Sequence, residues 1–397
     1  MDKSRLVVGF LNFGHALDHL AMLVYATAVL AMTAEFGLSY QEMLPLSLGG
    51  FLAFGAGSLP SGWLGDRWGR RNMMIVFFLG IGGALILAGS VTKPWQLVAA
   101  LTLIGVFASI YHPVGIAMLV KDQARLGRAL GWNGVWGNLG VAFAALIAGW
   151  LADHASWRAA FIVPGVLALA AGSAFAVLVP AAPAAASRPA GGRARPALDS
   201  AARRAFAVVT VATLCSGIIF AATTNAMPKI FDERLTALVN TTSGIGTLVS
   251  AVYAIAAMAQ LLVGQLIDRR SLRGVFLVLA ALQVPLLLLA GMFTDWPMLV
   301  IATAMMFVVF GIIPINDAMV ARYADDAWRS RVYAVRYVAS FGASLPAIWL
   351  VAYLQPRGDG FSPLFAVLTV VALGTLAAAL LFPADERNAA PAAAPAE

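Results

Sequence analysis

The chain has 397 residues, of which 61% are hydrophobic and 11% are charged. Water-soluble domains average roughly 45–50% apolar and about 25% charged residues, so this composition excludes an ordinary soluble domain. The formal net charge of +7 would suit a nucleic-acid-binding protein, but the charged residues stand in short turns between long apolar runs and form no basic face. We therefore expect a lipid bilayer as a partner and no nucleic acid.

In chain order, about twelve apolar runs have the roughly 20-residue length that crosses a bilayer as an α-helix. Helices satisfy their own backbone hydrogen bonds in lipid, so the sequence predicts an all-α integral membrane protein with twelve transmembrane helices. The expected spans of the first half are 6–32, 43–64, 73–92, 96–120, 128–151 and 158–180. Those of the second half are 205–229, 243–266, 273–293, 297–321, 330–353 and 363–383.

Two segments differ in composition from these spans. Residues 181–204 are rich in Ala, Pro, Gly and Arg, which is typical of a linker. Residues 385–397 form an Ala- and Pro-rich tail that we expect to be disordered. The linker divides the chain into two expected six-helix bundles, residues 1–180 and 205–384.

One charged turn occurs twice in the chain. Residues 62–71 read GWLGDRWGRR and residues 264–273 read GQLIDRRSLR, so five positions are identical at a separation of 202 residues. Each copy contains six spans, an even number, so both copies have the same orientation in the membrane. They are therefore expected to form parallel repeats related by an axis along the membrane normal.

The Lys and Arg residues are distributed unevenly between the loops. Twenty of the 26 lie in the segments on the side of the N-terminus, five lie in the segments on the other side, and Arg336 lies inside a span. Cytoplasmic loops carry the excess of Lys and Arg. We therefore expect both termini in the cytoplasm and the protein in a bacterial-type inner (plasma) membrane.

Residues 62–71 resemble the signature loop between helices 2 and 3 of the major facilitator superfamily, and residues 264–273 resemble its repeat between helices 8 and 9. The resemblance implies a membrane transporter rather than an enzyme, with a gating motif on the cytoplasmic side. The motif positions are Gly62, Asp66, Arg67, Gly69, Arg70 and Arg71, with Gly264, Asp268 and Arg269 in the second copy.

Two further spans resemble the fosmidomycin-resistance-like branch of bacterial efflux proteins. The similar residues are 111–115 (YHPVG) in the fourth span and the glycines around Asn138 in the fifth. This resemblance implies export. The fourth span has no buried Arg and the fifth lacks the Gly-Pro run typical of drug and proton antiporters, so the direction of transport stays open.

Ionisable side chains inside spans indicate function, because each costs roughly 2.5–3.5 kcal/mol at a helix centre on insertion scales. His15, Asp18 and His19 lie on one face of the first span. A rise of about 1.5 Å per residue places Asp18 about 18 Å into a core about 30 Å thick, and it places His112 at nearly the depth of His15. We predict that Asp18 is the main proton carrier, with His15, His19 and His112 as modulators or substrate contacts. A purely structural Asp–His pair is the alternative.

Polar side chains in other spans are the expected substrate contacts. Asp317 and Arg336 lie at matching depths near the cytoplasmic ends of neighbouring spans, so we expect them to form an ion pair. This pair either stabilises the fold or places Arg336 in contact with an anionic group of the substrate. The predicted substrate-binding residues are Asn12, Asn133, Asn138, Asn316, Asp317 and Arg336.

The leading hypothesis is a monomeric, proton-coupled secondary transporter that exports a small molecule by alternating access. The chain contains no Walker-type loop for ATP, so protons are the expected energy source. Its only cysteine, Cys215, excludes a Cys-based metal site, and we name no cofactor and no metal ligands among the expected site residues. Proton-coupled uptake of a small organic anion is the alternative, because Arg336, His112 and Lys229 favour an anionic substrate. Three other hypotheses are a divalent-metal exporter with imidazole ligands, a membrane-embedded zinc hydrolase, and a receptor that binds without transport.

Overall fold

The computed structural model describes residues 3–120, 126–180, 200–323, 338–340, 342–355 and 360–382. Eleven helices within these ranges are long and apolar enough to cross a membrane, by length and composition. The expected all-α membrane fold is confirmed. The helices of the first half are α1 (Lys3–Phe36), α2 (Tyr40–Met43), η1 (Leu44–Ser47), α3 (Leu48–Trp68), α4 (Arg70–Gly89), α5 (Pro94–Ala108), η2 (Tyr111–Gly115), α6 (Ile116–Leu119), α7 (Leu126–His154) and α8 (Trp157–Leu178). Those of the second half are α9 (Ser200–Arg234), α10 (Thr242–Arg269), α11 (Leu272–Ala290), α12 (Asp295–Tyr323), α14 (Ser344–Leu354) and α15 (Ser362–Leu381).

The observed helices extend beyond several expected spans. α1 runs from Lys3 to Phe36, and α9 begins at Ser200, inside the segment 181–204 that was expected to be a linker. Hydropathy marks only the apolar part of a helix, whereas polar turns can continue it beyond the hydrocarbon core. The rest of that linker, the tail and the first part of the eleventh span lie outside the described residues.

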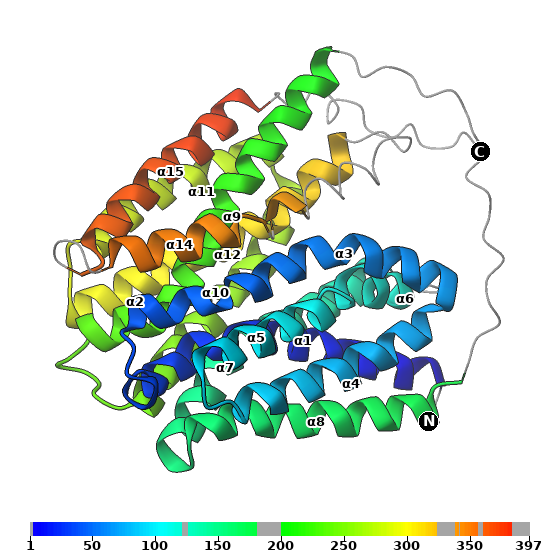
Figure 1. The fold of residues 1–397 in the computed structure, drawn as a ribbon. Helices are drawn as coiled ribbons and strands as arrows, with labels where there is room; N and C mark the ends of the chain where they lie inside the picture. Colours follow the sequence, from blue (N-terminus) through cyan, green and yellow to red (C-terminus); the bar gives the residue numbers. More distant parts are fainter. Residues whose placement is uncertain are drawn as a thin grey trace, which may run out of the picture.

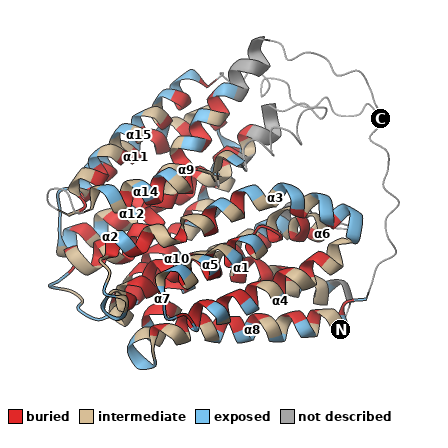
Figure 2. Cartoon of the chain, viewed as in Figure 1, coloured by how far each residue is buried: buried red, intermediate tan, exposed pale blue. Residues whose placement is uncertain are grey.

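The helices form two bundles (Figure 1). In the first bundle α1 packs against α7 and α4 against α8, and in the second α10 packs against α12 and α11 against α15. Buried residues line the interior of both bundles, as Figure 2 shows, while many large apolar side chains remain exposed on the outer faces. Trp95 and Trp296, in the first turns of α5 and α12, are each 65% exposed, which is typical of Trp at a membrane interface.

We call the end of the bundles that carries the turn between α3 and α4 the motif side, and the other end the far side. On the motif side, arginines 202 positions apart join corresponding helices. Arg71 of α4 donates hydrogen bonds to the carbonyls of Ala176 and Val179 at the end of α8. Arg273 of α11 donates to the carbonyl of Leu380 at the end of α15, at 2.9 Å. The repeat in sequence is therefore also a repeat in structure.

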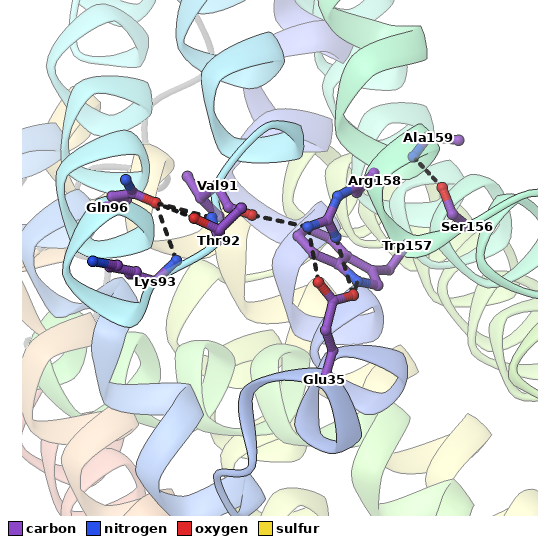
Figure 3. Close-up of polar contacts among 9 residues, drawn as sticks. All are labelled: Glu35, Val91, Thr92, Lys93, Gln96, Ser156, Trp157, Arg158 and Ala159. Atoms are coloured by element: carbon purple, nitrogen blue, oxygen red, sulfur yellow. Dashed lines mark hydrogen bonds and ion pairs between the residues drawn. The ribbon is translucent and has the colours of Figure 1, made fainter.

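On the far side, an acidic and a basic side chain join three helices of the first bundle (Figure 3). Glu35 at the end of α1 accepts hydrogen bonds from Nε1 of Trp157 at 2.7 Å and from Nη1 of Arg158 at 3.1 Å, and its Oε1 forms an ion pair with Nη2 of Arg158 at 2.8 Å. Arg158 also donates to the carbonyl of Val91, just after α4, at 3.1 Å. In the second bundle, Arg234 of α9 binds the end of α11 and the start of α15. Each bundle is thus held together at both ends, which favours its movement as one body.

The two bundles meet along α7 and α10. Near the far side the helix backbones touch at Gly149 and Gly246, where a Cβ on either glycine would overlap the facing backbone; small residues permit such close packing of membrane helices. At the same end, Oδ2 of Asp153 accepts a hydrogen bond from the backbone N–H of Ser243 at 2.6 Å. The bundles lie close together on the far side and diverge towards the motif side (Figure 1).

Candidate functional site

A short π-helix, η2, lies between α5 and α6 and carries His112. Pro113 has no backbone N–H, so it cannot continue the regular hydrogen-bond ladder of an α-helix. π-turns inside α-helices are frequent at functional sites. The side chains of Tyr111 and His112 extend from this turn to α1.

The carboxylate of Asp18 on α1 is completely buried. Within the described part of the chain, neither of its oxygens has a hydrogen bond. Oδ2 lies 3.4 Å from Nε2 of His112, which is ion-pair distance without hydrogen-bond geometry. An ionised carboxylate is costly in such surroundings unless a cation compensates its charge. The site can therefore hold a proton or another small cation.

His15 on α1 is held in one tautomer. Its Nδ1 lies 2.7 Å from the main-chain carbonyl oxygen of Asn133 on α7. A carbonyl only accepts hydrogen bonds, so Nδ1 of the neutral ring carries the proton and Nε2 keeps its lone pair. This Nε2 lies 3.2 Å from Nε2 of His19. The other side of the ring stacks on Tyr111, with 4.9 Å between ring centroids.

The imidazoles of His15, His19 and His112 form one cluster. The ring centroid of His112 lies 5.3 Å from that of His15 and 5.6 Å from that of His19. One ring nitrogen from each residue lies within 4.8 Å of the other two. The structure thus brings together the four residues that we predicted for proton coupling, and their roles remain predictions.

Polar side chains from two helices support the cluster. Nδ2 of Asn133 donates to the hydroxyl of Tyr111 at 2.8 Å and to Oδ1 of Asn12 at 3.0 Å. Gly137, one turn further along α7, faces His15 so closely that a Cβ there would lie 2.7 Å from Cε1 of the ring. Asn12 and Asn133, which we predicted as substrate contacts, are therefore bonded to one another in the wall of the cluster.

Asn138, another predicted substrate contact, lies between the bundles. Its side chain forms a reciprocal amide pair with Gln260 of α10, with distances of 3.0 Å from Nδ2 to Oε1 and 3.2 Å from Nε2 to Oδ1. The pair lies about 22 Å along α7 from Asp153, so the contact between α7 and α10 is long. Gln260 was not among the predicted contacts, although an amide in the interior of the apolar span 243–266 was an available signal.

The second bundle has a neutral polar pair in the corresponding place. Nδ2 of Asn316 on α12 donates to Oγ of Ser216 on α9 at 2.9 Å, and Oδ1 of Asn316 has no hydrogen bond to any residue that the structure describes. α9 and α12 correspond to the helices that carry Asp18 and His112. The side chain of Asp317 and the whole of Arg336 lie outside the described residues, and so does the ion pair expected between them.

The predicted gating motif surrounds the turn between α3 and α4. Gly69 has a φ of 102°, a conformation that favours glycine. Nη2 of Arg70 lies 3.3 Å from Oδ1 of Asp66, and its Nη1 donates to the carbonyl of Ala117 in α6 at 2.9 Å. Arg67 lies over a tryptophan ring of α3. The other motif residues on the ends of α3 and α10 are Gly62, Gly264, Asp268 and Arg269.

Comparison with known proteins points to one family. The sequence pattern of the Major Facilitator Superfamily matches residues 11–240. The puromycin resistance protein pur8 of Streptomyces alboniger is 35% identical over 123 residues, which are 30% of this chain and 24% of that protein. A probable 4-methylmuconolactone transporter of Cupriavidus pinatubonensis is 29% identical over 165 residues, 39% of each chain. The tetracenomycin C resistance and export protein of Streptomyces glaucescens is 30% identical over 158 residues, 38% of this chain and 29% of that protein. The matched stretches therefore span well under half of each of these relatives.

Solved structures agree with the architecture. A bacterial homolog of the human lysosomal transporter Spinster, in an inward-facing and unoccupied conformation, matches with a TM-score of 0.70 over 96% of this chain and 95% of that chain. The sequence identity is 14%, so this likeness shows the fold alone.

Proposed function

The chain belongs to the major facilitator superfamily of membrane transporters, and on this premise we propose that it exports a small molecule by alternating access in exchange for protons. In such a mechanism a central site opens first to one side of the membrane and then to the other. The two bundles, each joined internally by arginines at both ends, are the bodies that would move.

The observation that carries the coupling proposal is the environment of Asp18. Its carboxylate is fully buried and lies 3.4 Å from His112, and its charge has to be compensated whenever the site closes. A proton taken up from one side and released to the other supplies that compensation. His15 and His19, which adjoin His112, would modulate this exchange.

Two observations support export. A puromycin resistance protein and a tetracenomycin C resistance and export protein match parts of this chain. The bundles also touch near the far side, at Asp153 and Ser243, and diverge towards the motif side. If the motif side is cytoplasmic, as the distribution of Lys and Arg indicates, this arrangement would admit a substrate from the cell interior.

The substrate contacts are proposed to lie on both bundles. In the second bundle, Oδ1 of Asn316 is a buried acceptor that lacks a partner among the described residues, and Asp317 and Arg336 would extend that side of the site.

Uptake of an organic anion is supported less well. Nζ of Lys229 lies 2.6 Å from Asp232 and 3.5 Å from Glu233, so carboxylates already compensate its charge.

The test is substrate-driven proton flux in proteoliposomes that contain the wild type or Asp18→Asn. The panel includes puromycin, 4-methylmuconolactone, small organic anions and organic cations. We expect at least one compound to drive proton movement in the wild type, and we expect Asp18→Asn to bind that compound but to move no protons. Glu42→Gln is the matched control, because Glu42 is exposed and bonds only to its neighbour Ser39 among the described residues. Unchanged coupling in Asp18→Asn would make Asp18 a structural residue, and the sign of the flux separates export from uptake.

A further inference from the structure

The spacing of the imidazole cluster suits a metal ion. Zinc binds imidazole nitrogen at about 2.0–2.1 Å, so two ligands of one tetrahedral ion lie about 3.3 Å apart. The Nε2 atoms of His15 and His19 are 3.2 Å apart, and a nitrogen of His112 lies within 4.8 Å of the ligand atoms of both. In the metal-free protein the shorter distance corresponds to an N–H···N hydrogen bond. Transfer of that proton from Nε2 to Nδ1 of the neutral His19 ring leaves two Nε2 lone pairs that can bind one ion.

His15 is already oriented as a metal ligand would be. A metal-bound His usually donates its other ring N–H to a carbonyl or a carboxylate, which fixes the tautomer and the direction of the ring. Nδ1 of His15 donates to the carbonyl of Asn133 at 2.7 Å. Tyr111 stacks on the ring, and the α7 backbone at Gly137 lies against its edge. The Nε2 lone pair is therefore directed before any ion arrives.

Asp18 supplies the negative charge that a buried dication requires. Its side chain is fully buried, and neither oxygen has a hydrogen bond from any described residue. Its Oδ2 lies 3.4 Å from Nε2 of His112, one of the three clustered imidazoles, and three imidazoles with a carboxylate are a donor set that suits Zn²⁺, Co²⁺ or Ni²⁺. Mg²⁺ and Ca²⁺ prefer sites made entirely of oxygen ligands.

We propose that His15, His19, His112 and Asp18 bind one divalent transition-metal ion of the zinc class. This inference rests on the proposed function in one respect: the proton that couples transport would bind at the same four residues as the metal ion. A metal ion requires deprotonated ligands, so the ion and the proton compete for one site. A bound metal ion therefore arrests proton-coupled transport.

The experiment titrates the purified full-length protein in detergent with ZnCl₂ and CoCl₂, with MgCl₂ as the hard-cation comparison. We expect one Zn²⁺ per chain, release of protons on binding, and a Tm that rises with zinc concentration. Co²⁺ should give the intense visible bands of tetrahedral coordination. His19→Gln should weaken zinc binding by about 100-fold or more. Removal of a residue that only orients a metal ligand costs less, about 10- to 100-fold.

The chain offers matched controls, because it contains only four His and one Cys. His154→Gln removes the one histidine outside the cluster, which lies at the end of α7 and whose Nδ1 bonds to the carbonyl of Trp150. Cys215→Ala removes the only thiol. Both variants should bind zinc as the wild type does.

Absence of zinc binding in the wild type, or equal affinities of His19→Gln and His154→Gln, would overturn the proposal. If His19→Gln does not fold, the wild-type Co²⁺ spectrum decides, because the weak bands of octahedral, water-bound cobalt contradict a nitrogen-rich site. Proton-coupled transport without metal binding removes this inference alone. Metal binding by a protein that moves no protons removes the proposed coupling and leaves the metal site.

Discussion

At the scale of single residues, the position of His15 depends on main-chain atoms of α7. Its Nδ1 bonds to the carbonyl of Asn133, and its ring faces the backbone at Gly137. A main-chain carbonyl remains when a side chain is replaced, so the tautomer of His15 is insensitive to the side chain at position 133. The position of the ring, in contrast, is sensitive to any side chain at position 137.

Gly137→Ala should therefore disturb the cluster while α7 stays helical. The new Cβ would lie 2.7 Å from Cε1 of His15, and such overpacking costs roughly 1–3 kcal/mol. If about 1.4 kcal/mol of this strain raises the activation barrier of transport, substrate flux in proteoliposomes should fall about tenfold.

Gly134→Ala is the matched control on the same helix. A Cβ at position 134 would meet no atom within 4 Å among the described residues, and Ala is favoured over Gly inside a helix by up to about 1 kcal/mol. This variant should be at least as stable as the wild type and should transport normally. An equal loss of flux in both variants would contradict a specific effect on His15.

Part of the site could be predicted from the sequence. The rise per residue of a helix predicted similar depths for His15 and His112, and their ring centroids are 5.3 Å apart. The hydrogen-bond partners could not be predicted in this way. Whether Asn133 bonds to Tyr111 depends on the rotation of α7 about its axis, and a span that is apolar on all sides carries no amphipathic signal for that rotation.

At the scale of elements, the π-turn η2 is the feature that the sequence did not reveal. The apolar pattern of residues 96–120 predicted one continuous helix, whereas the structure has α5, η2 and α6. Pro113 was visible, but proline also occurs in simply kinked helices. A π-turn differs from an α-helix only in which carbonyl each backbone N–H binds. Hydropathy reports the polarity of side chains, so it does not distinguish the two.

The amide pair between α7 and α10 allows a second prediction. In a double-mutant cycle of Asn138→Leu, Gln260→Leu and the double variant, we expect an interaction energy of about 0.6 kcal/mol and at most about 1.7 kcal/mol, the range known for polar contacts between membrane helices. Each single variant leaves a half-buried amide without its partner, so the double variant should be more stable than additivity predicts. The measurement is the free energy of unfolding in mixed micelles.

The same variants test whether Asn138 contacts the substrate. A substrate affinity that falls in Asn138→Leu but not in Gln260→Leu would support a direct contact. Equal effects in both variants would assign the pair to the interface between the bundles. Additive unfolding free energies would contradict the pairing itself.

At the scale of the whole molecule, the fold was the most predictable property. The length of the apolar runs and the repeat at 202 residues were sufficient, because few backbone folds satisfy all their hydrogen bonds inside a membrane.

The repeated arginines bind repeated carbonyls, yet the polar chemistry differs between the bundles. The first bundle has Asp18 and three imidazoles, whereas the second has the neutral pair of Asn316 and Ser216.

A covalent link between the bundles on the far side should stop transport. In a Cys215→Ala background, Asp153→Cys and Ser243→Cys place thiols where a hydrogen bond now joins α7 to α10. Treatment with a short bifunctional thiol reagent should abolish substrate flux if the bundles must separate there. The measurement compares flux before and after linking with a cleavable reagent.

Glu35→Cys with Arg158→Cys is the control for this experiment. These positions lie in α1 and α8 of one bundle, so a link between them leaves the two bundles free to move. We expect its flux to persist after linking. Persistent flux in the Asp153 and Ser243 pair would contradict opening on the far side.

If Asp18 carries the coupling proton, as proposed, its depth makes the membrane voltage part of the driving force. Asp18 lies 13 residues into the span Arg5–Phe36, and the rise of a helix places it about 18 Å into a core about 30 Å thick, roughly three fifths of the way across from the motif side. Moving one charge across a whole membrane against 100 mV costs about 2.3 kcal/mol, so in a uniform field the part of the path up to Asp18 accounts for about 1.4 kcal/mol. A proton held by this carboxylate therefore responds to the electrical potential as well as to the pH difference. Vesicles with equal pH on both sides and an imposed potential would still drive the exchange.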